Sequence, residues 1–128
     1  MPETIEIQLK KGVLSLCVLA LLARSDSYAY EIASRLSAAI DMGEGTIYPL
    51  MRRMQSDGLV ETYLVESSAG PSRKYYRLTA AGRRALEDQG AEWTSFAAAV
   101  NAILAETDAP AAAPEPEAGA ELTEGAQQ

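Results

Sequence analysis

The stretch RKYYRLTAAGRR, from Arg73 to Arg84, gathers cationic side chains in a chain whose formal net charge is −7. Residues 1–86 hold eleven basic and nine acidic residues, whereas residues 87–128 hold nine acidic residues and no basic one. Arg and Lys neutralise phosphates, so the basic part suits a nucleic-acid or other polyanionic partner. The same asymmetry is equally typical of an ordinary domain with a solvated acidic tail.

Residues for catalysis or metal binding are scarce. The sequence has no histidine and one cysteine, Cys17. Zinc sites built from His and Cys, Ser–His–Asp or Cys–His nucleophiles, and a disulfide within one chain are therefore excluded. Cys17 lies among aliphatic residues, where a thiol serves as a small core group. We expect no enzyme, no metal site and no cofactor.

The apolar run from Val13 to Ala23 follows Lys10 and Lys11, as in a secretory signal peptide. The residues before it are acidic, however, and the run is shorter than the ~20 residues that span a membrane. We interpret it as part of a buried helix, Leu9–Arg24, and expect a cytoplasmic protein with no membrane segment.

Two further helices are predicted after it. Ser25, Asp26 and Ser27 favour helix N-caps, and a helix from Tyr28 to Ala39 follows. A third helix, 44–57, has a stripe at i, i+3, i+4 and i+7 and is ended by glycine 58; the stripe consists of Ile47, Leu50, Met51 and Met54.

The next segment predicts a β-hairpin. LVETYLVE and RKYYRL have strand-forming compositions, and SSAGPS between them provides turn residues. Alternation sends Tyr76 and Leu78 to one face of the second strand and Tyr75 and Arg77 to the other. Thr79 then caps a long helix, 80–105.

The long helix carries an apolar seam that repeats every seven residues, with Leu86, Trp93 and Val100 in one series and Phe96 and Ile103 in the other. It is long enough to pair with a partner helix. The residues that follow are rich in Ala, Pro, Glu and Gly, a composition typical of disorder. We predict three regions: a DNA-binding domain at 1–78, a dimerisation helix at 79–106 and a disordered acidic tail at 107–128.

Three helices, a hairpin and a long helix form the order of a winged helix-turn-helix. The predicted fold class is therefore mainly α with a small β-hairpin (α+β), followed by a long C-terminal dimerisation helix. In this architecture the third helix enters the major groove of DNA, and the hairpin reaches the neighbouring backbone or the minor groove. The residues left outside the core stripe could also form an ordinary solvated face. The predicted DNA-binding residues are Gly45, Thr46, Tyr48, Arg52, Arg53, Ser72, Arg73 and Lys74.

Two motifs carry a family resemblance. GTIYPLMRRMQSDGLV followed by GPSRKYYRLTAAGRRAL resembles the PadR family of bacterial transcriptional regulators. YAYEIASRL is similar to that family's second-helix stretch, and the match spans about residues 9–104. Tyr28 and Ala29 stand where the family often has His-Gly, and the wing has one basic residue fewer than the usual pattern.

The resemblance implies a homodimeric repressor on double-stranded DNA, with its long helix packed against the first helix of its partner. Thr46 and Tyr48 would start the DNA-facing helix, and Arg73 and Lys74 would stand on the wing. Some members hold flat aromatic or drug-like molecules between the paired long helices. Here Leu86, Trp93, Phe96, Val100 and Ile103 would form either this effector pocket or simply the dimer interface. A winged helix used for protein–protein contact, or a small-molecule carrier without DNA affinity, stays open as an alternative.

Overall fold

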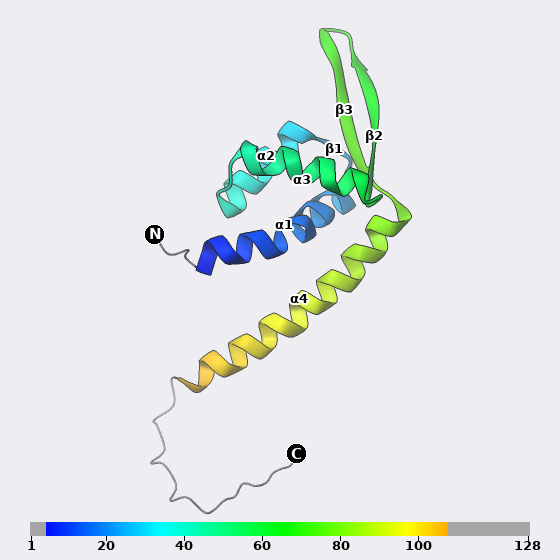
Figure 1. Cartoon of the computed structure of the whole chain (residues 1–128). Coiled ribbons are helices and arrows are strands. Elements are labelled where there is room, and N and C mark those ends of the chain that lie inside the picture. Colours follow the sequence, from blue (N-terminus) through cyan, green and yellow to red (C-terminus); the bar gives the residue numbers. More distant parts are fainter. Residues whose placement is uncertain (1–4, 108–128) are drawn as a thin grey trace, which may run out of the picture. The chain divides into compact units, whose positions relative to one another are not determined.

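The computed structural model describes residues 5–107 and shows mainly helices with a small antiparallel sheet, as predicted (Figure 1). The predicted tail lies outside the described residues apart from Thr107. The chain divides into two compact units, Met1–Thr94 and Ser95–Gln128. The elements in chain order are α1 (Ile5–Arg24), β1 (Ser27–Tyr28), α2 (Ala29–Ile40), α3 (Glu44–Ser56), β2 (Val60–Ser67), β3 (Gly70–Leu78) and α4 (Ala80–Glu106).

One hydrophobic core joins the helices of the first unit to the sheet. The apolar stripe predicted for α3 is buried, and Ile32, Ala33 and Leu36 bury the corresponding face of α2. From α1 the core receives Leu14, Val18, Leu19 and Leu22, and from the sheet it receives Val60, Tyr76 and Leu78. Removing this apolar surface from water is the main stabilising term of the domain.

The outer face of α1 differs from the prediction of a largely buried helix. Ile5 is 73% exposed and Leu9 is 43% exposed, although both are large apolar residues. At 3.6 residues per turn they lie away from the buried face. The composition of α1 indicates two apolar faces, and one domain of this size can cover only one of them.

The start of α2 also corrects the prediction, because its N-cap is Tyr28 and not a residue of the Ser25–Ser27 cluster. The backbone N–H of Tyr28 donates to the carboxylate of Glu31 (3.1 Å). Ser27 is buried and belongs to β1, a two-residue strand that local sequence did not indicate. The pairing of Ser27 with Tyr76 and of Tyr28 with Tyr75 creates this strand.

The end of α3 confirms the predicted role of Gly58. Its φ of +79° lies in the left-handed region that glycine adopts without strain. The N–H of Gly58 donates to the carbonyl of Gln55 (3.0 Å), and the N–H of Leu59 donates to the carbonyl of Met54 (3.0 Å). This pair of bonds is a Schellman motif, which satisfies carbonyls that the helix end leaves without partners.

The sheet has the order β1–β3–β2, and both pairings are antiparallel. Val60 pairs with Leu78 at the base, and Ser67 pairs with Gly70 at the tip, with an irregularity between Val65 and Ser67. The β2–β3 hairpin projects from the helices beside the C-terminal end of α3, where it forms the predicted wing (Figure 1).

The first turn of α4 is fixed by Thr79. Its hydroxyl oxygen accepts a hydrogen bond from the N–H of Gly82 (3.0 Å), and its hydroxyl donates to the carbonyl of Gly58 (2.6 Å). A Cβ at Gly82 would overlap the carbonyl oxygen of Leu59, so only glycine fits there. Leu86 packs at the edge of the core.

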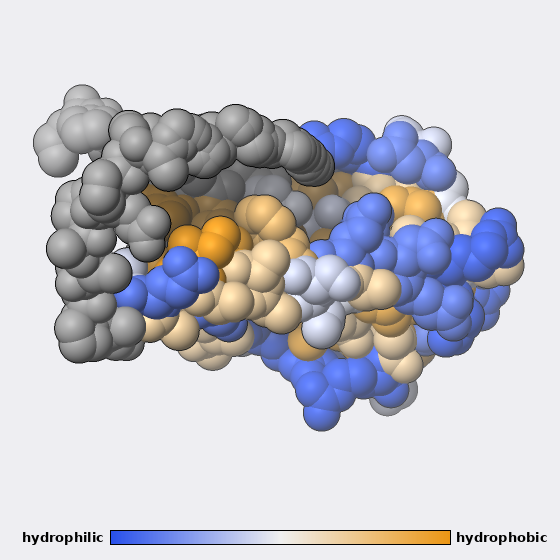
Figure 2. Space-filling view, turned by 90° about the horizontal axis from the view of Figure 1, so that it is seen from below, coloured by the Kyte–Doolittle hydropathy of each residue, from blue (hydrophilic) through white to orange (hydrophobic). Residues whose placement is uncertain are grey.

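The second unit is described over Ser95–Thr107 and consists of the remaining turns of α4. Its large apolar side chains are bare: Phe96 is 60%, Ile103 63% and Leu104 57% exposed. Among the described residues, no helix is both long and apolar enough to cross a membrane. Seen from below, hydrophobic surface (orange) lies beside hydrophilic surface (blue) (Figure 2).

Candidate functional site

The outward face of α3 follows from its helical period. Because Ile47, Leu50, Met51 and Met54 are buried, the opposite side of the helix carries Gly45, Pro49, Arg52 and Ser56, all of them exposed. Nothing lies within 4 Å of the position that a Cβ on Gly45 would take. The centre of this face is therefore narrow and open, with the Arg52 guanidinium as its charged group.

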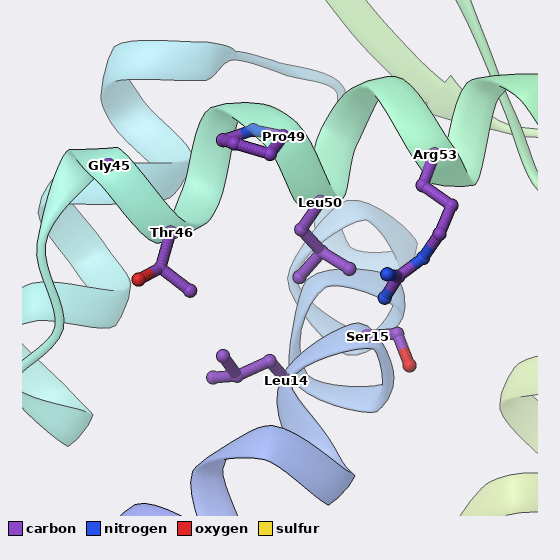
Figure 3. Close-up of a pocket in the computed structure, with 7 residues that line it drawn as sticks. All are labelled: Leu14, Ser15, Gly45, Thr46, Pro49, Leu50 and Arg53. Atoms are coloured by element: carbon purple, nitrogen blue, oxygen red, sulfur yellow. The ribbon is translucent and has the colours of Figure 1, made fainter.

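Thr46 and Arg53 lie on one flank of α3, where they line a groove of about 410 Å³ against α1 (Figure 3). Figure 3 shows the Arg53 side chain extending from α3 toward Ser15 of α1. Leu14, Pro49 and Leu50 complete the apolar part of the lining. An anionic group could reach the Arg53 guanidinium in this groove. The Arg53 side chain therefore lies beside the outward face of α3 and not at its centre.

Tyr48 lies on the other flank of α3. Two residues along a helix correspond to a rotation that places Thr46 and Tyr48 about 160° apart. Tyr48 is half-buried, whereas Thr46 is exposed. The two predicted hydroxyl donors therefore lie on different sides of α3. The sequence could have indicated this, because each residue of a helix turns the chain by about 100°.

The wing separates its predicted cations in the same way. Successive side chains of a strand point to opposite faces, so Ser72 and Lys74 share a face with Tyr76, and Arg73 lies on the other. The Lys74 ammonium is 5.9 Å from the centre of the Tyr76 ring. The Arg73 guanidinium instead lies 4.5 Å from the centre of the Tyr28 ring. The two residues can therefore contact different partners.

The outer face of the sheet carries a row of aromatic and guanidinium groups that the sequence predictions missed. Tyr63 of β2 stacks on Tyr75 of β3 (centroids 5.8 Å apart), and Tyr75 meets Tyr28 of β1 edge-on (5.5 Å). Arg77 lies over Tyr63 at one end (4.9 Å), and Arg73 lies over Tyr28 at the other. We call these five side chains the tyrosine row.

Two hydrogen bonds fix the Arg77 end of the tyrosine row, one to Asp26 before β1 and one to Glu61 within the hairpin. The Tyr63 hydroxyl donates to the carboxylate of Asp26 (2.6 Å), and this bond raises the pKa of Tyr63 because it favours the protonated phenol. Arg77 Nε donates to Glu61 (2.8 Å), which raises the pKa of Arg77 through the hydrogen bond and the carboxylate charge. Among the described residues, no carboxylate pairs with Arg73.

The apolar seam of α4 divides into a packed part and a bare part. Leu86 packs against the core, and Val100 is half-buried. Trp93 is 41% exposed, and Phe96 and Ile103 are more exposed still.

Cys17, at the edge of the core, is half-buried, and burial raises the pKa of its thiol.

Comparison with known proteins places this architecture in a family. The profile described as "Transcriptional regulator PadR-like family" matches residues 18–88, more than half of the chain. An uncharacterised protein of Lysinibacillus sphaericus is 32% identical over 87 residues, which cover 65% of this chain and 80% of that protein.

Solved structures agree with this family assignment. A PadR-like transcriptional regulator from Bacillus cereus is 39% identical and superposes with a TM-score of 0.70, covering 76% of this chain and 96% of that one. Bacillus subtilis PadR, solved in complex with operator DNA, shares the fold at 23% identity and a TM-score of 0.55, covering 60% and 46% of the two chains. Together, the sequence match over residues 18–88 and the winged helix-turn-helix architecture show that this chain belongs to the PadR-like family of transcriptional regulators.

Proposed function

We propose that this protein is a sequence-specific DNA-binding repressor that acts as a homodimer on a pseudo-palindromic promoter site. The observation that carries the proposal is the open outward face of α3, with Arg52, beside a wing on which Arg73 has no acidic partner within residues 5–107. Guanidinium groups contact phosphates and guanine edges. Within the family, Bacillus subtilis PadR has been solved with operator DNA.

The predicted DNA contacts are retained in the proposal with distinct places. Gly45 and Arg52 occupy the centre of the outward face of α3, where they would meet the major groove. Thr46 and Arg53 would contact DNA from the α1 flank and Tyr48 from the other flank. On the wing, Arg73 would reach a phosphate from the outer face, whereas Ser72 and Lys74 would do so from the inner one.

The bare apolar surfaces support the dimer. Among the described residues, Trp93, Phe96 and Ile103 on α4 and Ile5 and Leu9 on α1 are large apolar side chains with 41–73% of their surface exposed. Large exposed apolar groups mark interaction surfaces. We propose that α4 packs against α1 of a second copy and that the two copies of α3 lie about one helical turn of DNA apart.

The salt dependence of binding tests the DNA-binding function. A labelled duplex selected from random-sequence DNA is titrated with protein at several salt concentrations. Each phosphate neutralised adds about −0.9 to the slope of log K against log salt, so a dimer should give a steep slope. Arg52→Ala and Arg73→Ala should each weaken binding and flatten the slope, whereas Arg24→Ala, at the exposed end of α1, should not. A protein that selects no duplex, or binds without salt dependence, contradicts the proposal and favours a protein-binding or carrier role.

We further propose that a flat aromatic effector binds between the paired α4 helices, at Trp93, Phe96 and Val100. A ligand releases DNA only if it binds one dimer geometry better than the other. Trp93 is the only tryptophan, so its fluorescence reports directly on this position. Quenching by an aromatic compound that also lowers DNA affinity supports the effector role. Aromatic compounds that leave both the fluorescence and the DNA affinity unchanged leave these residues as interface core alone.

A further inference from the structure

The tyrosine row connects three strands that are distant in sequence. Tyr28 comes from β1, Tyr63 from β2, and Tyr75 from β3 between them, so the three rings lie across the sheet in one register. Aromatic pairs in offset or edge-on contact contribute about 0.5–1.5 kcal/mol beyond the burial of area. The row therefore links the projecting wing to the segment between α1 and α2.

The two ends of the row differ in charge compensation. At one end Glu61 pairs with Arg77, and Asp26 accepts the Tyr63 hydroxyl. At the other end Arg73 rests on the Tyr28 ring. Of the two arginines in the row, Arg77 alone has an acidic partner among the described residues. The uncompensated cation thus lies at the end nearer the wing tip, since Arg73 pairs with Val65 and Arg77 with Glu61 farther down the hairpin.

Contact with an aromatic ring leaves a guanidinium free to bind an anion. The ring lies against the face of the guanidinium, whereas its N–H donors point outward in the plane of the group. Arg73 can therefore keep its contact with Tyr28 while its edge donates to a phosphate. A side chain already held in place loses less conformational entropy on binding than a freely rotating one.

We propose that the tyrosine row is a positioning element for DNA binding, in which Tyr28 holds Arg73 ready for a backbone phosphate and the Tyr63–Asp26 hydrogen bond anchors the opposite end. Tyr28, Tyr63 and Asp26 are positioning residues, and Arg73 makes the contact. Lys74, on the opposite face of the wing, does not depend on Tyr28. This inference rests on the proposed DNA-binding function.

A double-mutant cycle on DNA affinity tests the inference. The variants are Tyr28→Leu, Arg73→Ala and their combination, measured with the duplex selected above. Arg73→Ala should weaken binding about tenfold and reduce the salt slope by about one for each wing that contacts DNA. Tyr28→Leu should weaken binding about three- to fivefold while Arg73 is present, in line with the strength of one cation–π contact. In the Arg73→Ala background it should have almost no effect.

Two controls separate positioning from a general loss of structure. In a Lys74→Ala background, Tyr28→Leu should cost the same three- to fivefold as in the wild type, because Lys74 lies on the other face of the wing. Tyr28→Phe keeps the ring beneath the guanidinium and should bind like the wild type. If Tyr28→Leu lowers the melting temperature, Tyr63→Phe replaces it in the cycle, since it removes only the hydroxyl that donates to Asp26. Its cost should also vanish in the Arg73→Ala background.

The outcomes distinguish this inference from the function on which it rests. Failure of the wild type to bind any duplex overturns the proposed function and the inference with it. Binding by the wild type, with equal costs of Tyr28→Leu in the presence and absence of Arg73, overturns the inference alone. Unchanged binding by Arg73→Ala does the same.

Discussion

The beginning and the remainder of α4 carry the same apolar seam in different surroundings. In its first two turns Gly82 is pressed against the Leu59 carbonyl and Leu86 packs on the core. Farther along, Phe96 and Ile103 are largely exposed, and Trp93 is 41% exposed. The difference shows that a seven-residue repeat marks an apolar face of a helix but does not say whether the same chain covers it.

The largest effect is expected where α4 is covered by its own chain. Gly82→Ala should destabilise the domain by about 3 kcal/mol or more, because the new methyl group cannot fit beside the backbone of Leu59. Thermal or denaturant unfolding measures this loss. Gly90→Ala in the same helix is the matched control, since nothing lies near its Cβ position, and it should stabilise by ~0.5–1 kcal/mol. Equal stabilities would mean that the start of α4 is not packed as described.

A substitution in the exposed part of the seam should weaken the proposed dimer. Phe96→Glu places a charge where we propose a partner helix, so the dimer should dissociate about a hundredfold more readily. Sedimentation at several protein concentrations measures the equilibrium. Ser95→Glu adds the same charge at an exposed neighbour, about 100° around the helix from Phe96 and outside the seam, and should leave the dimer intact. A dimer that tolerates Phe96→Glu would show that this part of the seam is not the interface.

A smaller effect is expected from the cap of α4. Thr79→Ala removes the oxygen that accepts from the N–H of Gly82 and should cost about 1 kcal/mol of stability. Thr79→Ser keeps the hydroxyl and should stay within a few tenths of a kcal/mol of the wild type. Because the cap lies in the packed part of α4, dimer dissociation should not change at protein concentrations where both variants are folded. If Thr79→Ala changes dimer dissociation and Thr79→Ser does not, the cap of α4 and the exposed part of its seam are energetically coupled.

The elements that local patterns specify were predictable from the sequence. The i, i+3, i+4, i+7 stripe located α3, Gly58 marked its end, and Thr79 marked the beginning of α4. The segment SSAGPS indicated the hairpin, although the turn lies at Ser68 and Ala69 and the Gly70–Pro71 pair belongs to β3. Alternation assigned Tyr76 and Leu78 to the core. Each of these signals lies within a few residues of the feature that it predicts.

Features that depend on distant partners were not predictable in this way. Strand β1 is two residues long and exists through its pairing with Tyr75 and Tyr76. The tyrosine row likewise needs that pairing, because Tyr28 and Tyr63 are separated by two helices in sequence. The opposite faces of Arg73 and Lys74, by contrast, follow from the strand period and could have been assigned.

The Thr79 hydroxyl bonded to Gly58 has a mechanical consequence. Gly58 ends α3, and the N–H of Thr79 also donates to the carbonyl of Leu59 (3.1 Å), directly before β2. The last turn of α3, the base of the wing and the first turn of α4 therefore meet at one joint. Any rotation of the first turn of α4 must carry the end of α3 with it or break these hydrogen bonds. The joint can thus transmit torque from α4 to α3, the helix that we propose contacts DNA.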